Sequence, residues 1–160
     1  MNNISRIYVD MDGVIANFEK CYSERYGYIS ETQRRTQFIT NFIDFIATKQ
    51  FETLELLPDG QLLIDALNSL DIPKEILSSY AHENNELTVP PQKEFWLAKH
   101  NITWPQNFVP GKDHKYKWAR PDTIIIDDTL SVIEDWRRAG GIAIHHTDAA
   151  TTLVELSKYL

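Results

Sequence analysis

The chain has 160 residues, of which 42% are hydrophobic and 24% are charged, a composition typical of one folded domain and too apolar for a largely disordered chain. Lys and Arg number 16 and Asp and Glu 23, so the formal net charge is −7. This charge argues against a general nucleic-acid or anionic-membrane binder, because such proteins neutralise phosphates with a basic surface.

The single cysteine, Cys21, excludes an internal disulfide and indicates a reducing compartment. The N-terminal residues contain only a short apolar stretch, interrupted by Asp10 and Asp12, so the sequence predicts neither a signal peptide nor a membrane span. We therefore expect a cytoplasmic protein.

Short apolar runs predict buried strands at 4–9, 75–78, 108–109, 123–126 and 142–144. Helical spacing predicts two helices between 16 and 49, broken near Gly27, and a third after 58–60 with Asp59 as its N-cap. Further helices are expected after Pro90-Pro91, over 130–139 and over 149–159. Strands that alternate with helices predict a three-layer, Rossmann-like α/β domain with a mostly parallel sheet.

Three of the expected strands end in acidic or hydroxyl residues, namely Asp10 and Asp12, Ser78 and Ser79, and Asp127 and Asp128. In a parallel sheet these ends share one edge, where four carboxylates repel one another unless a cation or shared protons offset their charge. Mg²⁺ suits an oxygen-only site and takes a substrate phosphate as a further ligand. We therefore predict Mg²⁺ as the cofactor and a phosphate ester as the substrate.

The first acidic pair also allows other interpretations. A calcium loop starting at Asp10 needs an acidic residue at its twelfth position, where this chain has Cys21. A sugar-nucleotide transferase would use the Asp-x-Asp pair for its metal but would leave Asp127 and Ser78 without a role; it stays open as a minor alternative. In a purely structural interpretation, the acidic residues would be helix caps or solvated turns. This interpretation would have to hold at two separate strand ends, and we therefore do not favour it.

Two further groups give no sign of a site. A cysteine-phosphatase signature needs an arginine six positions after Cys21, where this chain has Gly27. The neighbouring His145 and His146 close the last expected strand and should point to opposite faces, so we expect no metal role for them.

Four ordered segments resemble the motifs of the haloacid dehalogenase superfamily of phosphohydrolases: 8–16 (YVDMDGVIA), 76–79 (ILSS), a downstream lysine and 124–128 (IIIDD). The chain looks most like the 5'(3')-deoxyribonucleotidases and their short bacterial and phage relatives. Phe18, the run FETLELLPDG at 51–60, and Trp136 before Gly140-Gly141 carry this closer resemblance.

The resemblance implies a role for each acidic residue. Asp10 would be the nucleophile that forms an aspartyl-phosphate, and Asp12 would protonate the leaving oxygen and then activate water. Asp128 would complete the Mg²⁺ shell together with the Asp10 carboxylate and the Asp12 backbone carbonyl, while Asp127 would orient or share that duty.

The resemblance also implies residues that bind substrate. Ser78 would hydrogen-bond the transferred phosphoryl group, with Ser79 beside it. Lys117 best matches the phosphate-stabilising lysine, and Lys115 and Lys93 are the other candidates. The relatives often carry Arg and Asn after the last acidic pair, whereas Thr129 and its neighbours follow here, so this loop is expected to contribute less to recognition.

We expect a catalytic core of residues 1–17 and 58–160 and a small helical cap of residues 18–57, in which Phe18 would stack on a nucleobase. The expected activity is Mg²⁺-dependent hydrolysis of (deoxy)ribonucleoside monophosphates, as in a 5'-nucleotidase. A phosphatase for another small ester, such as a sugar phosphate, and a non-catalytic nucleotide-binding protein with this fold are the alternatives. We expect no stable complex with nucleic acid or membrane; base and sugar preference, 5' against 3' phosphate, and a homodimer stay open.

Overall fold

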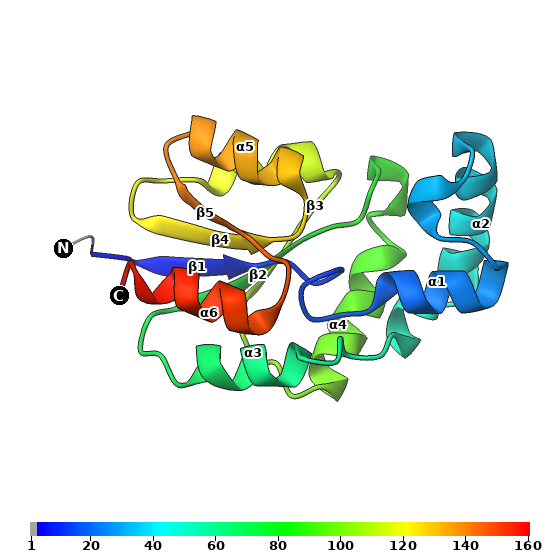
Figure 1. The fold of residues 1–160 in the computed structure, drawn as a ribbon. Coiled ribbons are helices and arrows are strands. Elements are labelled where there is room, and N and C mark those ends of the chain that lie inside the picture. The colour runs from blue at the N-terminus through cyan, green and yellow to red at the C-terminus, as the bar shows by residue number, and fades with distance from the viewer. Residues whose placement is uncertain (1–2) are drawn as a thin grey trace.

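The computed structural model describes residues 3–160, which contain a five-stranded sheet in the order β3-β2-β1-β4-β5. The strands are β1 (Arg6–Val9), β2 (Lys74–Ser79), β3 (Gln106–Val109), β4 (Thr123–Asp127) and β5 (Ile142–His145). Every neighbouring pair is parallel, so all carboxyl ends lie at the same edge of the sheet (Figure 1). The predicted three-layer α/β fold is confirmed.

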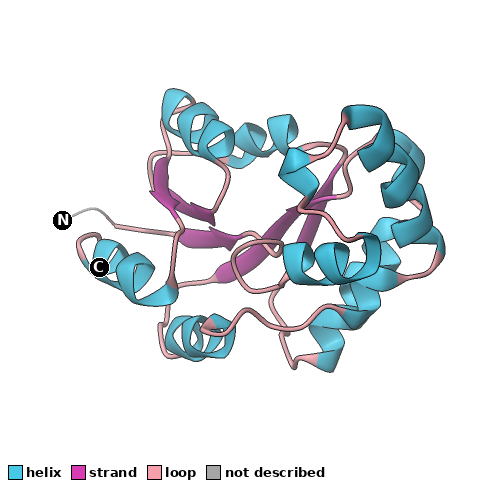
Figure 2. Ribbon diagram, turned by 45° about the vertical axis from the view of Figure 1, so that its right-hand side comes forward, coloured by secondary structure: helices cyan, strands magenta, loops and turns pink. Residues whose placement is uncertain are grey.

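Helices cover both faces of this sheet (Figure 2). On one face, α3 (Gly60–Asn68), α4 (Val89–Lys99) and α6 (Ala149–Ser157) pack on the larger apolar core. On the other face lie α5 (Leu130–Arg138) and a 3₁₀ helix, η4 (Lys112–Trp118).

The strands show why both faces need cover. Ile7 and Val9 point into the larger core, whereas Tyr8 between them points into the smaller one and meets the Trp136 ring edge-on at 5.6 Å. Alternate residues of a strand face opposite sides, so an apolar run such as this one can only be buried by two layers of helices.

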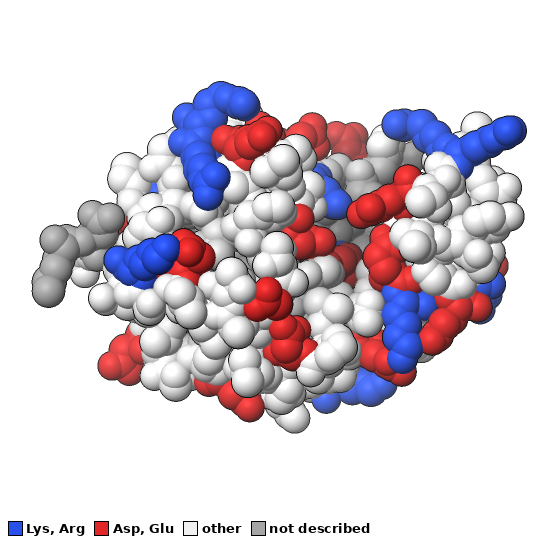
Figure 3. Space-filling view, in the orientation of Figure 1, with Lys and Arg blue, Asp and Glu red and all other residues white. Residues whose placement is uncertain are grey.

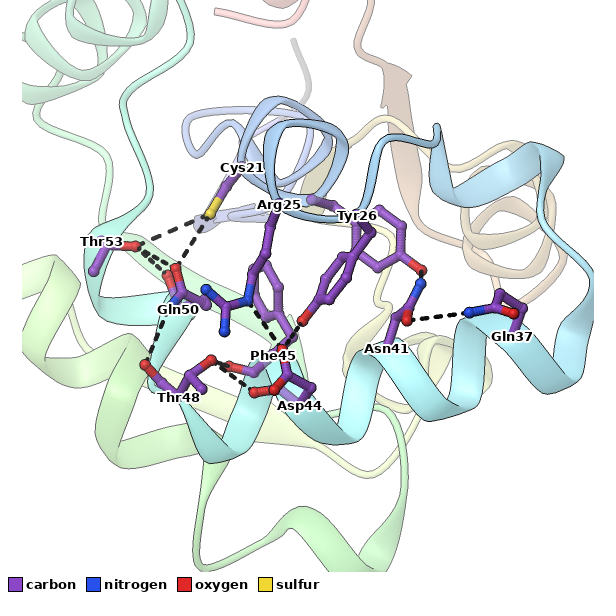
Figure 4. A network of polar contacts seen from close by, with 11 residues as sticks. Cys21, Arg25, Tyr26, Gln37, Asn41, Asp44, Phe45, Thr48, Gln50 and Thr53 are labelled. Carbon is purple, nitrogen blue, oxygen red and sulfur yellow. Dashed lines mark hydrogen bonds and ion pairs between the residues drawn. The ribbon is translucent and has the colours of Figure 1, made fainter.

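A helical insertion extends beyond the carboxyl edge of the sheet (Figure 1). It comprises α1 (Phe18–Tyr26), η1 (Ser30–Thr32), α2 (Arg35–Ala47) and η2 (Gln50–Thr53). The break expected near Gly27 is present, because Gly27 ends α1 with a left-handed φ of 75°. Arg25 Nε and Tyr26 Oη both donate to Asp44 Oδ2, at 3.0 and 2.6 Å, and so join α1 to α2 (Figure 4).

The two ends of the insertion meet at its base. Asn17 N donates to Glu55 O at 2.8 Å, and Leu57 N donates to Ile15 O at 2.9 Å. Its function as a cap separate from the core stays a prediction.

Helix α4 ties this insertion to the core. Gln92 Nε2 donates to Ile46 O at 2.9 Å, and the buried Trp96 donates from Nε1 to Leu54 O at 2.7 Å. Because the two acceptors are backbone carbonyls at the end of α2 and after η2, α4 fixes the insertion at two points.

One local prediction is wrong in its chemistry. Asp59 directly precedes α3, but its side chain makes no capping bond to that helix. Asp59 Oδ2 instead accepts a hydrogen bond from Ala149 N at 2.6 Å, at the first residue of α6. The carboxylate thus satisfies a free N–H group of a helix distant in the sequence.

The remaining helix of residues 3–160 is a short 3₁₀ turn, η3 (Glu83–Asn85). Within these residues, no helix combines the length and the apolar character needed to cross a membrane.

Candidate active site

A buried lysine joins the acidic residues that end β1 and β4. Lys115, from η4, is 1% exposed, and its Nζ lies 2.9 Å from Asp10 Oδ1 and 2.7 Å from Asp127 Oδ2. Asp127 Oδ1 accepts a further bond from Thr129 N at 2.9 Å. Two carboxylates from neighbouring strands are therefore held by one ammonium group.

The pKa values show that this lysine does not offset all of the negative charge. Burial alone would lower the pKa of Lys115, but the charges of Asp10 and Asp127 raise it above its ordinary value. Burial and the Asp10 charge raise the pKa of Asp127. Although the Asp128 side chain reaches solvent, burial of its carboxylate and the charges of Asp10 and Asp127 raise its pKa to about 8. A carboxyl group whose pKa lies above neutral, as that of Asp128 does, releases its proton when a cation binds to it.

A second buried lysine organises the other side of the edge. Lys93 projects from α4, is 1% exposed, and donates from Nζ to Asp12 Oδ2 at 3.1 Å, Ser78 Oγ at 2.7 Å and Ser79 O at 2.8 Å. An ammonium group has three protons, so each of them has an acceptor. The Ser79 side chain accepts from Ala81 N at 2.9 Å and so stabilises the loop after β2.

The geometry brings together most of the predicted residues. Asp10, Asp12, Ser78, Asp127 and Asp128 all lie at the carboxyl edge, linked directly or through Lys93 and Lys115. Lys117, the favoured candidate for the phosphate-stabilising lysine, is the exception.

Lys117 is exposed, and its Nζ lies 2.9 Å from His114 Nδ1, so the preference for Lys117 over Lys115 and Lys93 is not supported. In a 3₁₀ helix, side chains three residues apart share a face. Lys112 and Lys115 therefore share one face of η4, and Lys117 lies on another. This three-residue spacing is the signal in the sequence that could have identified Lys112 as a neighbour of the site.

Phe18 lies in an aromatic cluster of the insertion. Its ring is partly buried, with ring centroids of Tyr22 at 5.5 Å, Phe45 at 5.1 Å and Phe51 at 5.9 Å. The Phe51 centroid in turn lies 5.0 Å from Lys93 Nζ. The aromatic cluster thus reaches Lys93 at the carboxyl edge of the sheet through Phe51, and stacking of Phe18 on a nucleobase stays a prediction.

The neighbouring histidines point in different directions, as expected for adjacent residues of a strand end. His145 Nε2 lies 2.9 Å from Asp128 O, whereas the buried His146 has its Nδ1 2.8 Å from Thr152 Oγ1 in α6.

Three carboxylates form a group that fits a metal ion. Asp10, Asp127 and Asp128 each offer one oxygen within 4.8 Å of the others. Gly13 makes room for the carboxylate of Asp128. It has a φ of 83°, and a Cβ at this position would lie 2.0 Å from Asp128 Oδ2. Only glycine allows this approach. Hard oxygen donors with an excess of negative charge fit Mg²⁺.

The surface around this edge is strongly charged. Figure 3 shows a hollow between the sheet-bearing part and the helical insertion, with acidic side chains on both of its sides and basic atoms visible inside.

No protein-family model and no curated protein matches the chain. Solved structures do resemble it. A hydrolase from Pseudomonas syringae has a TM-score of 0.61 at 10% identity, covering 97% of this chain and 99% of that chain. L-2-haloacid dehalogenase from Xanthobacter autotrophicus has a TM-score of 0.56 at 10% identity, covering 98% of this chain and 84% of that chain.

D,D-heptose 1,7-bisphosphate phosphatase from Burkholderia thailandensis has a TM-score of 0.54 at 13% identity, and the match covers 96% of this chain and 99% of that chain. At these identities the likeness shows the fold alone. The chain shares the fold of these three proteins, and this is the fold that the resemblance of its sequence motifs implies.

Proposed function

We propose that the protein is a Mg²⁺-dependent phosphomonoesterase in which Asp10 is the nucleophile. The observation that carries this proposal is the arrangement of two buried lysines: Lys115 holds Asp10, and Lys93 holds Asp12 and Ser78 beside it. This arrangement supplies a nucleophile, a second carboxyl group and cationic donors within one edge of the sheet, which is what phosphoryl transfer requires.

In the first step, Asp10 attacks the phosphorus atom with the carboxylate oxygen that does not face Lys115. A bond forms between this oxygen and phosphorus, and the bond from phosphorus to the ester oxygen breaks. Asp12 donates its proton to the departing oxygen. Asp12 Oδ2 accepts from Lys93, whereas Oδ1 is enclosed and has no hydrogen-bond partner within residues 3–160, so Oδ1 is the atom available for this proton.

In the second step, the Asp12 carboxylate takes a proton from water, and the water oxygen attacks the phosphorus of the aspartyl-phosphate. The bond from phosphorus to Asp10 breaks, which releases inorganic phosphate and restores the free carboxylate. Lys93 and the Ser78 hydroxyl stabilise the charge on the phosphoryl oxygens. Loss of one such donor typically lowers kcat by about 10²–10³-fold.

Asp10, Asp127 and Asp128 would hold the Mg²⁺ ion, which when bound offsets negative charge on the phosphoryl oxygens and the nucleophile. The Asp12 backbone carbonyl would add a ligand from the same loop. Gly13 keeps this loop close to Asp128.

For the substrate, we propose a nucleoside monophosphate. The support is the sequence resemblance to deoxyribonucleotidases and the contact between Lys93 and Phe51, which brings an aromatic cluster to the catalytic edge. A sugar phosphate is the second candidate, because the Phe18 ring is already packed against other rings and offers a base less surface than stacking would use.

The test is phosphate release from deoxy- and ribonucleoside 5'- and 3'-monophosphates and from hexose phosphates, each with Mg²⁺ or EDTA. Wild type and Lys117→Met should turn over in Mg²⁺, and Asp10→Asn should not. Phe18→Leu should raise KM for nucleotides but not for hexose phosphates if the base stacks there. If only hexose phosphates were hydrolysed, the substrate would be a sugar phosphate and not a nucleotide. If no ester were hydrolysed, the proposed phosphatase activity would be refuted.

A further inference from the structure

Resting on the proposed phosphatase function, we propose that Lys112 and Thr129 form a second anion subsite at the rim of the active site. The preferred substrate is then a phosphate ester with a second anionic group, such as a bisphosphate. The transferred group reacts at Asp10, and the other group binds at Lys112.

Lys112 is a cation of η4 that lies at the rim of the site and is not paired with its carboxylates. Lys93 and Lys115 are buried and paired with carboxylates. Lys112 is exposed, and in the described part of the chain no carboxylate lies within the 4.0 Å limit of an ion pair with it. Its Nζ donates instead to Thr129 Oγ1 at 3.3 Å. An exposed ammonium group whose nearest partner is a hydroxyl can take up an anion without first breaking an ion pair.

The position of Lys112 is fixed by the same helix that places Lys115. The two lysines are three residues apart in η4 and therefore share one face of this 3₁₀ helix. Thr129 directly follows Asp128, and its backbone N–H binds Asp127 Oδ1. The ammonium group of Lys112 thus lies at the residue that directly follows the carboxylates that would hold the metal ion.

The charge balance explains why a substrate needs this lysine. With Asp12 protonated, as the first step requires, Lys93, Lys115 and one Mg²⁺ would carry one positive charge more than the three carboxylates of Asp10, Asp127 and Asp128. The dianionic phosphate group that reacts offsets this one excess charge, so the charge of Lys112 remains for a further anionic group of the substrate. Each further negative group on the substrate increases the electrostatic gain from this one cation.

The sheet order separates the two anion positions. Ser78 and Lys93 serve the transferred phosphoryl group on the β2 side of β1, whereas Thr129 follows β4 on the opposite side of β1. Lys112 binds to Thr129, so the group that it receives is one that the reaction does not transfer. This separation favours binding of a second anionic group of the substrate at Lys112, and not an additional contact between Lys112 and the transferred phosphoryl group.

The test compares kcat/KM for two matched pairs, a nucleoside 3',5'-bisphosphate against its 5'-monophosphate and glucose 1,6-bisphosphate against glucose 6-phosphate. In wild type we expect the bisphosphate of at least one pair to be preferred. Lys112→Met should lower kcat/KM about fivefold for that bisphosphate, the upper range for an exposed ion pair, and less than twofold for the monophosphate. Lys117→Met, an exposed lysine of the same helix, is the matched control and should lower neither.

An equal loss on both members of a pair would mean that Lys112 binds the transferred group, and no loss on either would mean that it binds no substrate; both results overturn the proposal. A pair of inert ligands separates this failure from failure of the proposed function. Calorimetry with Mg²⁺ should show that Lys112→Met weakens binding of methylenebisphosphonate more than that of methylphosphonate, whether or not any ester is hydrolysed. Equal weakening, or none, would again overturn the proposal.

Discussion

Replacing Lys115 by methionine removes the ammonium group between two buried carboxylates and keeps a side chain of similar length. The Asp10 and Asp127 side chains are 7% and 0% exposed, so water cannot take the place of the lysine. Removing one partner of a buried ion pair typically costs about 3–5 kcal/mol, because the remaining charge stays buried without compensation. The two pairs share one ammonium group, so we do not double this figure.

The expected loss in the free energy of unfolding is therefore about 3 kcal/mol or more at neutral pH, a large share of the about 5–15 kcal/mol of a typical domain. The loss should shrink in acid, where the carboxyl groups can be protonated and no charge is left unpaired. It should also shrink when Asp127 is replaced by asparagine in the same chain, since one of the two uncompensated charges is then absent.

Urea unfolding in EDTA at pH 7 measures this loss, with Lys117→Met as the control. Lys117 is exposed, and its replacement should change stability by less than about 0.5 kcal/mol. The double variant Lys115→Met/Asp127→Asn should be more stable than Lys115→Met alone. If Lys115→Met were as stable as Lys117→Met, the ion pairs of Lys115 would not stabilise this edge and the reasoning would fail.

Three further predictions follow from other features of the site and the fold. In the metal-free protein, the free energy of unfolding should fall as pH rises from about 4, the ordinary pKa of a carboxyl group, through about 8, the pKa of Asp128. Asp128 is partly exposed, so we expect a change on the order of 1 kcal/mol; urea titrations in EDTA measure it, and added Mg²⁺ should reverse the slope. Gly13→Ala should abolish stabilisation by Mg²⁺, because the new Cβ meets Asp128; Gly27→Ala, with a φ of 75° and open space around it, is the control for backbone strain and should keep the Mg²⁺ effect in thermal unfolding. Asp59→Ala should cost about 1 kcal/mol through the N–H group of Ala149 that loses its acceptor; an unchanged Tm would show that the bond contributes nothing.

The acidic edge could be predicted from the sequence because it depends on regular structure. Once β1 and β4 are identified as parallel neighbours, Asp10, Asp127 and Asp128 must lie at the same edge, whatever the loops do. The hydrophobic period identifies these strands, since a run such as 123–126 has no other way to be buried.

The lysines could not be chosen in the same way, because their positions depend on irregular structure. Lys115 and Lys117 are two residues apart, and only the three-residue turn of η4 decides which one faces the sheet. Lys93 depends on how α4 packs against the insertion, a tertiary contact without a local signal. Asp59 shows the same limit, since it stabilises a helix that begins 90 positions later in the chain.

The bonds of α4 have a consequence for how the protein could be remodelled. Lys93 lies in the same helix as Gln92 and Trp96, which bind the carbonyls of Ile46 and Leu54 in the insertion. The insertion therefore helps to set the position of an ammonium group that holds Asp12 and Ser78. A chimaera in which this insertion is replaced by one of another shape would have to supply acceptors at both carbonyl positions. Without them, Lys93 would be misplaced although it lies outside the exchanged segment.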